Sequence, residues 1–234
     1  MKEEALEVIE RALSQGRSSL VEYEAKRVLK AYGLPIPEEK LVENPDEAVE
    51  YANEIGYPVV LKLMSPQILH KSDAKVVALN VGTDEDLRKA WKEIHNNAKK
   101  YKDDAEIIGV LVAPMLKPGK EIIVGVTKDP QFGHALMFGL GGIYVDFLKD
   151  VSFGLAPLSK AEAAKMVERT KAYVLLRGVR GRPRADIEAV VEALVRVSKL
   201  VSDFPEVSYL DVNPLVAYES GRGCIALDVK MGIS

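Results

Sequence analysis

Two short stretches of this sequence contain side chains that can handle phosphate. In the first, the apolar run 58–64 carries Lys62 and leads into the polar loop 65–73, which presents His70 beside Lys71. A lysine inside an apolar strand is costly to bury without a partner, and a bound phosphate would offset that cost. A neutral imidazole has a free lone pair near pH 7 and can accept a phosphoryl group as a nucleophile. Lys71 could neutralise part of the incoming phosphate charge.

The second stretch lies near the C-terminus and is rich in oxygen ligands. Asp211 and Asn213 alternate along the expected strand 207–217, so both side chains should project from the same face. Asp228 follows on the partner strand of the expected hairpin, after a turn at 219–223. Carboxylate and amide oxygens are ligands that Mg²⁺ prefers. A lysine, a histidine and magnesium ligands together indicate phosphoryl transfer from or to a nucleotide.

Each of these residues also has an ordinary structural explanation. Lys62 could extend along the surface with its ammonium in water, and His70 could be a solvated loop residue. Asn213 could simply belong to a turn at the end of a strand. Of the other two histidines, His95 is expected on a solvated polar helix face, and His134 is expected to be structural.

The composition is that of an ordinary globular protein. A chain of 234 residues suffices for one large domain or two packed lobes. The net charge of −3 gives no electrostatic support for nucleic-acid binding. No apolar run reaches the length of about 18 residues that a membrane helix needs, so no membrane association is expected. The acidic segment 1–4 lacks the apolar core of a signal peptide. Cys224 is the only cysteine, which rules out an intrachain disulfide and fits a cytoplasmic location.

Periodicity and capping signals predict helices alternating with strands. Capping boxes are expected at Ser19 with Glu22 and at Ser159 with Glu162. The predicted helices are 4–14, 19–33, 45–56, 83–101, from 159 onward, and 185–202, and the predicted strands are 59–64, 75–81, 107–113, 120–127, 134–139, 207–217 and 224–231. This pattern is α+β, with mostly antiparallel strands in two lobes.

The order of these pieces resembles the ATP-grasp fold. More narrowly, the sequence resembles the nucleotide-binding β subunit of ADP-forming acyl-CoA (acetyl-CoA) synthetases, and it is similar to the β subunit of succinyl-CoA synthetase. The segments that carry the resemblance are 20–26 (LVEYEAK), 32–37 (YGLPIP), 58–62 (PVVLK), 69–73 (LHKSD), 112–115 (VAPM) through 119–122 (GKEI), 211–215 (DVNPL) and Asp228. The 69–73 loop resembles the phosphohistidine loop of the acetyl-CoA branch, which the succinyl branch lacks. Ala113 departs from the acidic residue that the succinyl branch tends to have.

The resemblance covers essentially the whole chain and implies a role for each candidate residue. It implies one ATP-grasp domain over 1–234, with approximate lobes 20–113 and 114–234 that enclose a nucleotide site. Lys62 would hold nucleotide phosphates, Glu121 would line the nucleotide site, and Asn213 with Asp228 would bind Mg²⁺. Asp211 would then be free to orient and polarise His70. The segment that would bind adenine, mainly through backbone groups, consists of Val112, Ala113, Pro114 and Met115.

Three features of the sequence allow both a functional and a simpler interpretation. Glu121 could be an edge-strand charge that blocks aggregation. The glycines 139, 141 and 142 could approach phosphates closely or could form a plain turn. The basic segment 177–182 could meet a partner or a phosphorylated segment, or could be a solvated loop.

The implied activity is that of half an enzyme. No Gly-x-Gly-x-x-Gly turn of a CoA-binding Rossmann segment is present. The resemblance implies a CoA-binding α subunit as partner, in an α2β2 assembly. That subunit would make an acyl phosphate and deliver a phosphoryl group to His70, which would pass it to ADP–Mg²⁺ to make ATP. The net reaction is acyl-CoA + ADP + phosphate ⇌ acid + CoA + ATP. The alternatives are a succinyl-CoA synthetase β-type subunit, another ATP-grasp ligase, or a non-catalytic nucleotide-sensing module.

Overall fold

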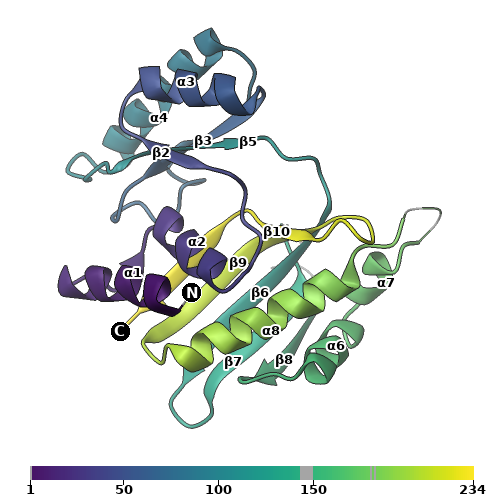
Figure 1. The fold of residues 1–234 in the computed structure, drawn as a ribbon. Helices are drawn as coiled ribbons and strands as arrows, with labels where there is room; N and C mark the ends of the chain where they lie inside the picture. The colour runs from purple at the N-terminus through teal and green to yellow at the C-terminus, as the bar shows by residue number, and fades with distance from the viewer. Residues whose placement is uncertain (1, 143–149, 180, 182) are drawn as a thin grey trace. The chain divides into compact units, whose positions relative to one another are not determined.

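The chain forms two compact units, which are described separately (Figure 1). In this computed structural model, the described residues are 2–142, 150–179, 181 and 183–234. Unit 1 comprises Met1–Ile36 and Pro118–Ser234, and unit 2 comprises Pro37–Lys117.

The two units differ from the lobes 20–113 and 114–234 that the sequence suggests. Residues 20–36 belong to unit 1, because the strand and helix that they form pair with and pack against the last strand of the chain. Unit 2 extends to Lys117, since the segment predicted to bind adenine continues the sheet of that unit.

Unit 1 is built on a seven-stranded sheet in which every strand pair is antiparallel. The strand order is β1-β11-β9-β6-β7-β8, and β10 pairs with β9. The strands are β1 (Ser19–Leu20), β6 (Lys120–Asp129), β7 (Gly133–Leu140), β8 (Val151–Leu155), β9 (Val207–Ala217), β10 (Cys224–Ala226) and β11 (Val229–Ile233). The helices are α1 (Lys2–Ser14), α2 (Glu22–Ala31), α6 (Lys160–Glu168), α7 (Ala172–Leu176) and α8 (Ile187–Asp203).

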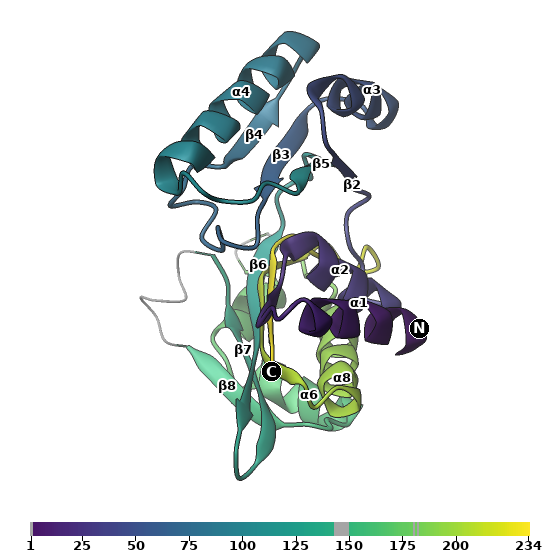
Figure 2. The ribbon, with the colours of Figure 1, turned by 90° about the vertical axis from the view of Figure 1, so that its left-hand side faces the viewer.

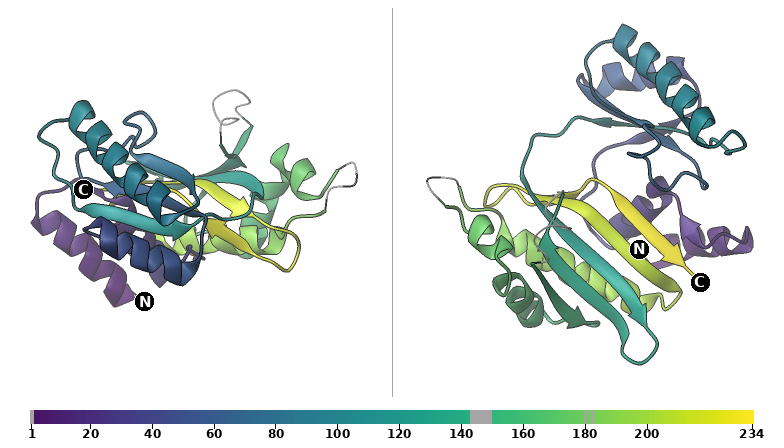
Figure 3. Two further views of the ribbon diagram at one scale, coloured as in Figure 1. Left: turned by 90° about the horizontal axis from the view of Figure 1, so that it is seen from above. Right: turned by 180° about the vertical axis from the view of Figure 1, so that it is seen from behind.

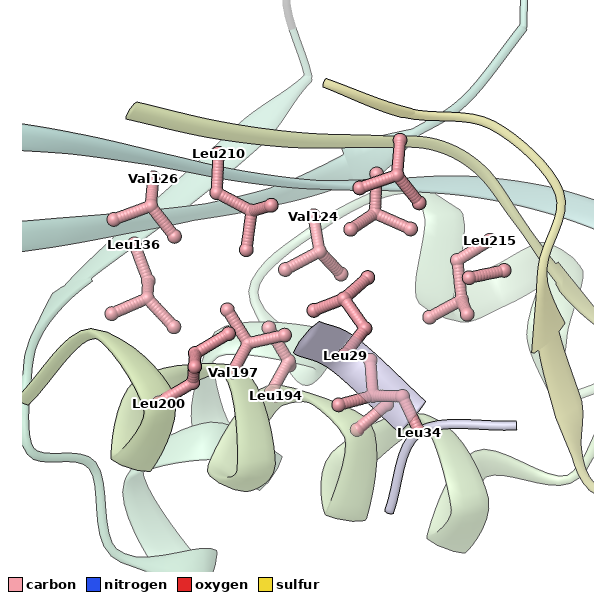
Figure 4. Packing of buried hydrophobic residues seen from close by; sticks show 14 of the residues in the cluster. Leu29, Leu34, Val124, Val126, Leu136, Leu194, Val197, Leu200, Leu210 and Leu215 are labelled. Carbon is pink, nitrogen blue, oxygen red and sulfur yellow. The ribbon is translucent and has the colours of Figure 1, made fainter. Parts of the chain in front are cut away.

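The core of unit 1 lies between the helices and one face of this sheet. Leu194, Val197 and Leu200 of α8 face apolar side chains of the central strands (Figure 4). Leu29 of α2 and the following Leu34 pack into the same cluster. In the right-hand view of Figure 3, the strands of unit 1 face the viewer and α8 lies behind them. This sheet face, opposite α8, is called the open face below.

Unit 2 contains a smaller antiparallel sheet with the order β2-β5-β3-β4. Its elements are β2 (Lys40–Val42), α3 (Pro45–Ile55), β3 (Val59–Met64), β4 (Val77–Val81), α4 (Asp84–Tyr101) and β5 (Gly109–Pro114). Figure 2 shows α3 and α4 together on one side of these strands. Tyr51 of α3 and Trp91 of α4 bury their side chains in one cluster with Leu61 and Leu63 of β3.

Most of the predicted helix ends are confirmed. The Asn44 side chain accepts a hydrogen bond from the Glu47 N–H at the start of α3, and Thr83 accepts one from Asp86 at the start of α4. The capping box of Ser159 is present at α6. These ends were predictable because each depends on residues three positions apart.

The capping box predicted at Ser19 is wrong. Ser19 pairs with Gly232 in the β1–β11 ladder, and α2 begins instead after Val21, whose N–H donates to the Glu24 carboxylate at 3.1 Å. The predicted strand 224–231 is also divided, into β10 and β11. Short elements that the sequence did not predict are β1, β2, β8 and α7. Throughout the described part of the chain, no helix has the length and apolar character needed to span a membrane.

Candidate active site

Lys62 occupies the middle of β3, one of the two inner strands of the unit 2 sheet. Its strand neighbours Leu61 and Leu63 belong to the core under α3 and α4, so alternation places Lys62 on the opposite face. The strand is paired on both sides, with Val77 of β4 and Leu111 of β5 opposite the lysine. Lys62 is half-buried. A half-buried lysine on a strand that is paired on both sides is well placed for a phosphate.

His70 is exposed on a loop whose backbone is held in place. Ile68, two residues before it, is only 1% exposed and belongs to the unit 2 core, and Ala74 after it is also buried. The His70 carbonyl accepts the Ala74 N–H at 3.1 Å, and the Lys71 carbonyl accepts the Val76 N–H at 3.0 Å. The loop therefore presents the imidazole to solvent from a backbone that its own hydrogen bonds fix.

The segment predicted to bind adenine ends β5. The Met115 N–H donates to the Pro58 carbonyl at 2.9 Å, so the peptide groups of Met115 face β3. Peptide groups alternate along a strand, so the Pro114 carbonyl points to the other side of β5. On that side the pairing with β2 stops where Lys40 meets Val112. The Pro114 carbonyl thus lies past the end of β2, where it could accept a hydrogen bond from an adenine amino group.

In unit 1, the predicted alternation along β9 is confirmed. Leu210 and Val212 are buried in the core, so Asp211 and Asn213 lie on the open face. The Asn213 N–H donates to the Asp228 carbonyl at 3.1 Å, which places the two proposed magnesium ligands side by side.

A β-bulge in β9 orients Asn213. Val212 pairs with Val124 and Leu215 pairs with Ile122, so Asn213 and Pro214 together oppose a single residue of β6. Bulges re-aim side chains and are over-represented next to active sites. The sequence alternation gave no signal for this irregularity.

The glycine segment lies against two of the predicted site residues. The Gly142 N–H donates to Asn213 Oδ1 at 3.0 Å, and the Gly141 N–H donates to the Glu121 carbonyl at 3.0 Å. Gly142 has φ +62°, and a Cβ on it would collide with the Glu121 carboxylate. The left-handed backbone conformation favours glycine at position 142, and the segment contacts both Glu121 and Asn213. The sequence had left the role of these glycines open.

The donor set in unit 1 fits Mg²⁺. Asn213 supplies an amide oxygen and Asp228 a carboxylate whose Oδ1 accepts the Val229 N–H at 3.1 Å. In the described ranges, no group of three or more His, Cys, Asp and Glu side chains could hold a metal ion by itself. Mg²⁺ usually keeps several waters and binds through one or two protein oxygens plus substrate phosphates. Two hard oxygen donors are what such an ion requires of the protein.

Asp211 is partly enclosed on the open face. Burial raises the pKa of its carboxyl group, and the positive charge of Lys230 opposes this rise. Lys230 is its direct neighbour in the β9–β11 ladder. A carboxylate on the same face as the proposed metal ligands could accept a hydrogen bond from an imidazole N–H.

The remaining histidines have structural contacts. His134 is buried, and its Nε2 lies 2.7 Å from the Val207 carbonyl oxygen, as expected for a structural residue. His95 is not simply solvated: its ring stacks on Trp91 with the centroids 4.9 Å apart, and its Nδ1 lies 2.7 Å from the Trp91 carbonyl oxygen. In the basic segment 177–182, Arg177 is exposed, whereas residues 180 and 182 lie outside the described residues.

Comparison with known proteins shows the family of this chain. The family profile of the ATP-grasp domain matches residues 11–233. The chain is 60% identical over 232 residues to the β subunit of acetate–CoA ligase [ADP-forming] II of Pyrococcus furiosus, covering 99% of this chain and 98% of that subunit. The chain belongs to the ATP-grasp β subunits of ADP-forming acetate–CoA ligases. The predicted fold class, α+β with antiparallel sheets in an ATP-grasp fold, is thereby confirmed.

Two further relatives of this β-subunit family are informative. The chain is 48% identical over 232 residues to 4-hydroxybutyrate–CoA ligase [ADP-forming] of Nitrosopumilus maritimus, but it covers only 33% of that longer protein. A structure of acetyl-coenzyme A synthetase 1 of Candidatus Korarchaeum cryptofilum matches with a TM-score of 0.86 and 40% identity, covering 98% of this chain and 100% of that one. That structure contains coenzyme A and Mg-AMPPCP, and its phosphohistidine segment points towards the nucleotide-binding site.

Proposed function

We propose that this chain is the nucleotide-binding half of an ADP-forming acyl-CoA synthetase, in which His70 accepts a phosphoryl group and passes it to ADP. The net reaction is acyl-CoA + ADP + phosphate ⇌ acid + CoA + ATP. The observation that carries the proposal is the exposed imidazole of His70 on a loop whose backbone is fixed by its own hydrogen bonds. A succinyl-type mechanism needs no histidine at this position.

Lys62 and the β5 segment would bind the nucleotide from unit 2. The ammonium group of the half-buried Lys62 residue would contact a nucleotide phosphate, and the Pro114 carbonyl would accept a hydrogen bond from the adenine amino group. Val112, Ala113 and Met115 would contribute apolar contact.

The residues of unit 1 would hold the metal and orient the acceptor. Asn213 and Asp228 would bind Mg²⁺, which offsets the negative charge of the nucleotide phosphates when it is bound. Glu121 would line the same region, because Gly142 lies against both its carboxylate and Asn213. Asp211 would accept a hydrogen bond from the His70 imidazole and fix its orientation, as carboxylates commonly do for histidines.

A CoA-binding α subunit would supply the other half of the reaction. Two observations support this: the 60% identical relative is named a β subunit, and the longer 48% identical relative contains about twice as much sequence beyond the match. We further propose an α2β2 assembly in the cytoplasm. The cytoplasmic location rests on the single cysteine, since extracellular proteins of this kind commonly use disulfides.

Reconstitution tests the division of labour. The isolated chain should bind Mg-ATP but form no acyl-CoA from acid, CoA and ATP, and addition of a CoA-binding α subunit should start turnover. The matched control is the same reconstitution with His70→Asn, which should bind Mg-ATP and remain inactive. Acyl-CoA synthesis by the isolated chain would show that it is a complete enzyme. Turnover of the His70→Asn complex would assign it a succinyl-type mechanism.

A further inference from the structure

The loop that carries His70 is tied to the rest of unit 2 by side chains at both of its ends. At its start, Gln67 Oε1 accepts the Glu106 N–H at 3.1 Å and the Ser65 hydroxyl at 3.1 Å. The Ser65 Oγ accepts the Gln67 N–H in return, at 3.3 Å. Gln67 therefore holds the start of the loop against the segment that precedes β5.

At the end of the loop, the tie comes from α4. The Asn97 side chain donates from Nδ2 to the Lys75 carbonyl at 2.9 Å. Asn97 lies in the C-terminal half of α4 and is half-buried. Asparagine is a weaker helix former than alanine, because its side chain competes for backbone hydrogen bonds. Asn97 thus does not favour its own helix, and the contact that it makes is to the loop.

The backbone of Lys75 shows why this tie matters. Lys75 has φ +53°, which lies in the left-handed region. Within the described part of the chain, Asn80 is the only other residue besides glycine with a positive φ, and asparagine visits this region readily. Lysine does not, because its Cβ comes too close to the following carbonyl oxygen. The carbonyl that Asn97 holds therefore belongs to a strained residue.

The left-handed residue closes the turn that carries His70. The Ala74 N–H donates to the His70 carbonyl at 3.1 Å, and the Val76 N–H donates to the Lys71 carbonyl at 3.0 Å. Lys75 lies between these two donors. If Lys75 left the left-handed conformation, the chain would no longer bring the Val76 N–H back to Lys71. The position of the imidazole therefore depends on the backbone conformation of Lys75.

We propose that Asn97 is a positioning residue for phosphoryl transfer: it holds Lys75 in the left-handed conformation and thereby fixes the loop that presents His70. The inference rests on the proposed function and deepens it. Gln67 fixes the start of the same loop. A displacement of a reacting group by about 1 Å can lower a rate by about 100-fold. An exposed loop avoids such displacements when it is attached to a packed element, and α4 is packed into the unit 2 core.

Two measurements report this role, one on the reaction and one on the loop. In the reaction, the ring nitrogen of His70 that lacks a proton attacks the γ-phosphorus of ATP. A P–N bond forms, and the P–O bond to ADP breaks with its electron pair leaving on ADP. The full-length chain receives saturating Mg-ATP labelled in the γ-phosphate, and the initial rate of labelling on His70 is measured. Hydrogen exchange of the Ala74 and Val76 N–H groups, measured without nucleotide, reports the loop itself.

The test variant is Asn97→Ala, and the matched control is Asn53→Ala. Asn53 also lies on a helix of unit 2, and its Nδ2 also donates to a carbonyl, but to that of Val49 within α3, at 3.0 Å. If Asn97→Ala does not fold, Asn97→Asp carries the same test. The ionised carboxylate has nearly the same shape as the amide but cannot donate to the Lys75 carbonyl.

Asn97→Ala should lower the labelling rate by about 2- to 13-fold, the factor that corresponds to one net hydrogen bond. Exchange of the Ala74 and Val76 N–H groups should become faster by a similar factor. Asn53→Ala should change neither rate. Both variants should keep the Mg-ATP affinity of the unsubstituted chain, because the loop position affects the transfer step and not the binding of nucleotide.

A second substitution separates positioning from a general structural effect. Glycine adopts the left-handed conformation without steric cost, so Lys75→Gly should favour that conformation by about 5- to 30-fold relative to lysine. Asn97→Ala combined with Lys75→Gly should therefore recover most of the lost labelling rate. A loss that arose in α4 itself would not be recovered by a change of backbone preference at position 75.

The outcomes separate this role from the role of His70. If the unsubstituted chain is not labelled on His70, the proposed function fails, and the exchange rates alone decide whether Asn97 fixes the loop. Equal labelling and exchange rates in Asn97→Ala and Asn53→Ala would overturn the positioning role. A loss of Mg-ATP affinity in Asn97→Ala would also overturn it, since Asn97 would then serve nucleotide binding. A slower labelling rate that Lys75→Gly does not recover would overturn the part assigned to the Lys75 backbone, and with it the proposal.

Discussion

Asn213 offers a prediction in which two effects of one side chain can be separated. Its Oδ1 accepts the Gly142 N–H at 3.0 Å, and the same amide is a proposed magnesium ligand. Asn213→Ala removes both contacts. The lost neutral hydrogen bond should lower the free energy of unfolding by about 0.5–1.5 kcal/mol, and the lost contact to a charged ion should weaken Mg-ADP binding by about 1.5–3 kcal/mol, or roughly 10- to 150-fold.

Calorimetry and urea unfolding measure these effects. ADP binding is measured in the presence of Mg²⁺ and again in excess chelator. Without Mg²⁺, the substitution should weaken ADP binding by no more than the lost hydrogen bond accounts for, about 2- to 13-fold. Asn213→Asp keeps an oxygen at the ligand position and should retain most of the Mg-ADP affinity. The control is Asn53→Ala on α3, which loses side-chain hydrogen bonds to the Val49 carbonyl and the Asp84 carboxylate, and should lower stability alone. An equal loss of affinity with and without Mg²⁺ would refute the assignment of Asn213 to the metal.

Three further predictions address the phosphate contact, the acid stability and the core. Lys62→Ala should weaken ADP binding by about 10- to 150-fold both with and without Mg²⁺; unchanged affinity in both titrations would remove Lys62 from the phosphate site. Backbone N–H groups, first that of Gly223, lower the pKa of the Asp186 carboxyl group. The ionised carboxylate therefore stabilises the folded protein at pH values above the ordinary carboxyl pKa of about 3.9. This contribution is lost as the pH falls through the lowered pKa of the folded state. In urea unfolding, the loss of stability in Asp186→Asn should therefore become smaller as the pH falls below the lowered pKa. A loss that does not depend on pH would contradict the stabilisation of the Asp186 carboxylate by these N–H groups. Leu194→Ala, at a side chain with 0% exposure, should cost about 2–5 kcal/mol in urea unfolding, and a loss below about 1 kcal/mol would mean that the α8 core is not packed as described.

The features that sequence reasoning predicted well depend on neighbours along the chain. The caps at Asn44, Thr83 and Ser159 join residues three positions apart, and the shared face of Asp211 and Asn213 follows from the alternation of a strand. Local patterns of this kind are readable because the same short geometry recurs in most proteins.

The features that it missed depend on contacts between distant segments. Ser19 has the spacing of a cap to Glu22, but pairing with Gly232 holds it in a strand. The hydrogen bond from Gly142 to Asn213 joins two segments of unit 1 that lie 71 positions apart in the sequence, and no local pattern predicts it. The roles of Lys62, His70 and Asn213 remain predictions that the variants above can test, and the roles of Glu121, Asp211 and Asp228 also remain predictions.

The central claim is that His70 carries the phosphoryl group, and phosphoryl labelling from ATP tests it most directly. The full-length chain is incubated with Mg-ATP labelled in the γ-phosphate, and the labelled residue is identified by peptide mapping. We expect an acid-labile, base-stable phosphoramidate on His70 that disappears in His70→Asn, while that variant keeps the Mg-ATP affinity of the unsubstituted chain. His95→Asn is the matched control and should label normally. A label on any other residue, or normal labelling of His70→Asn, would contradict the account.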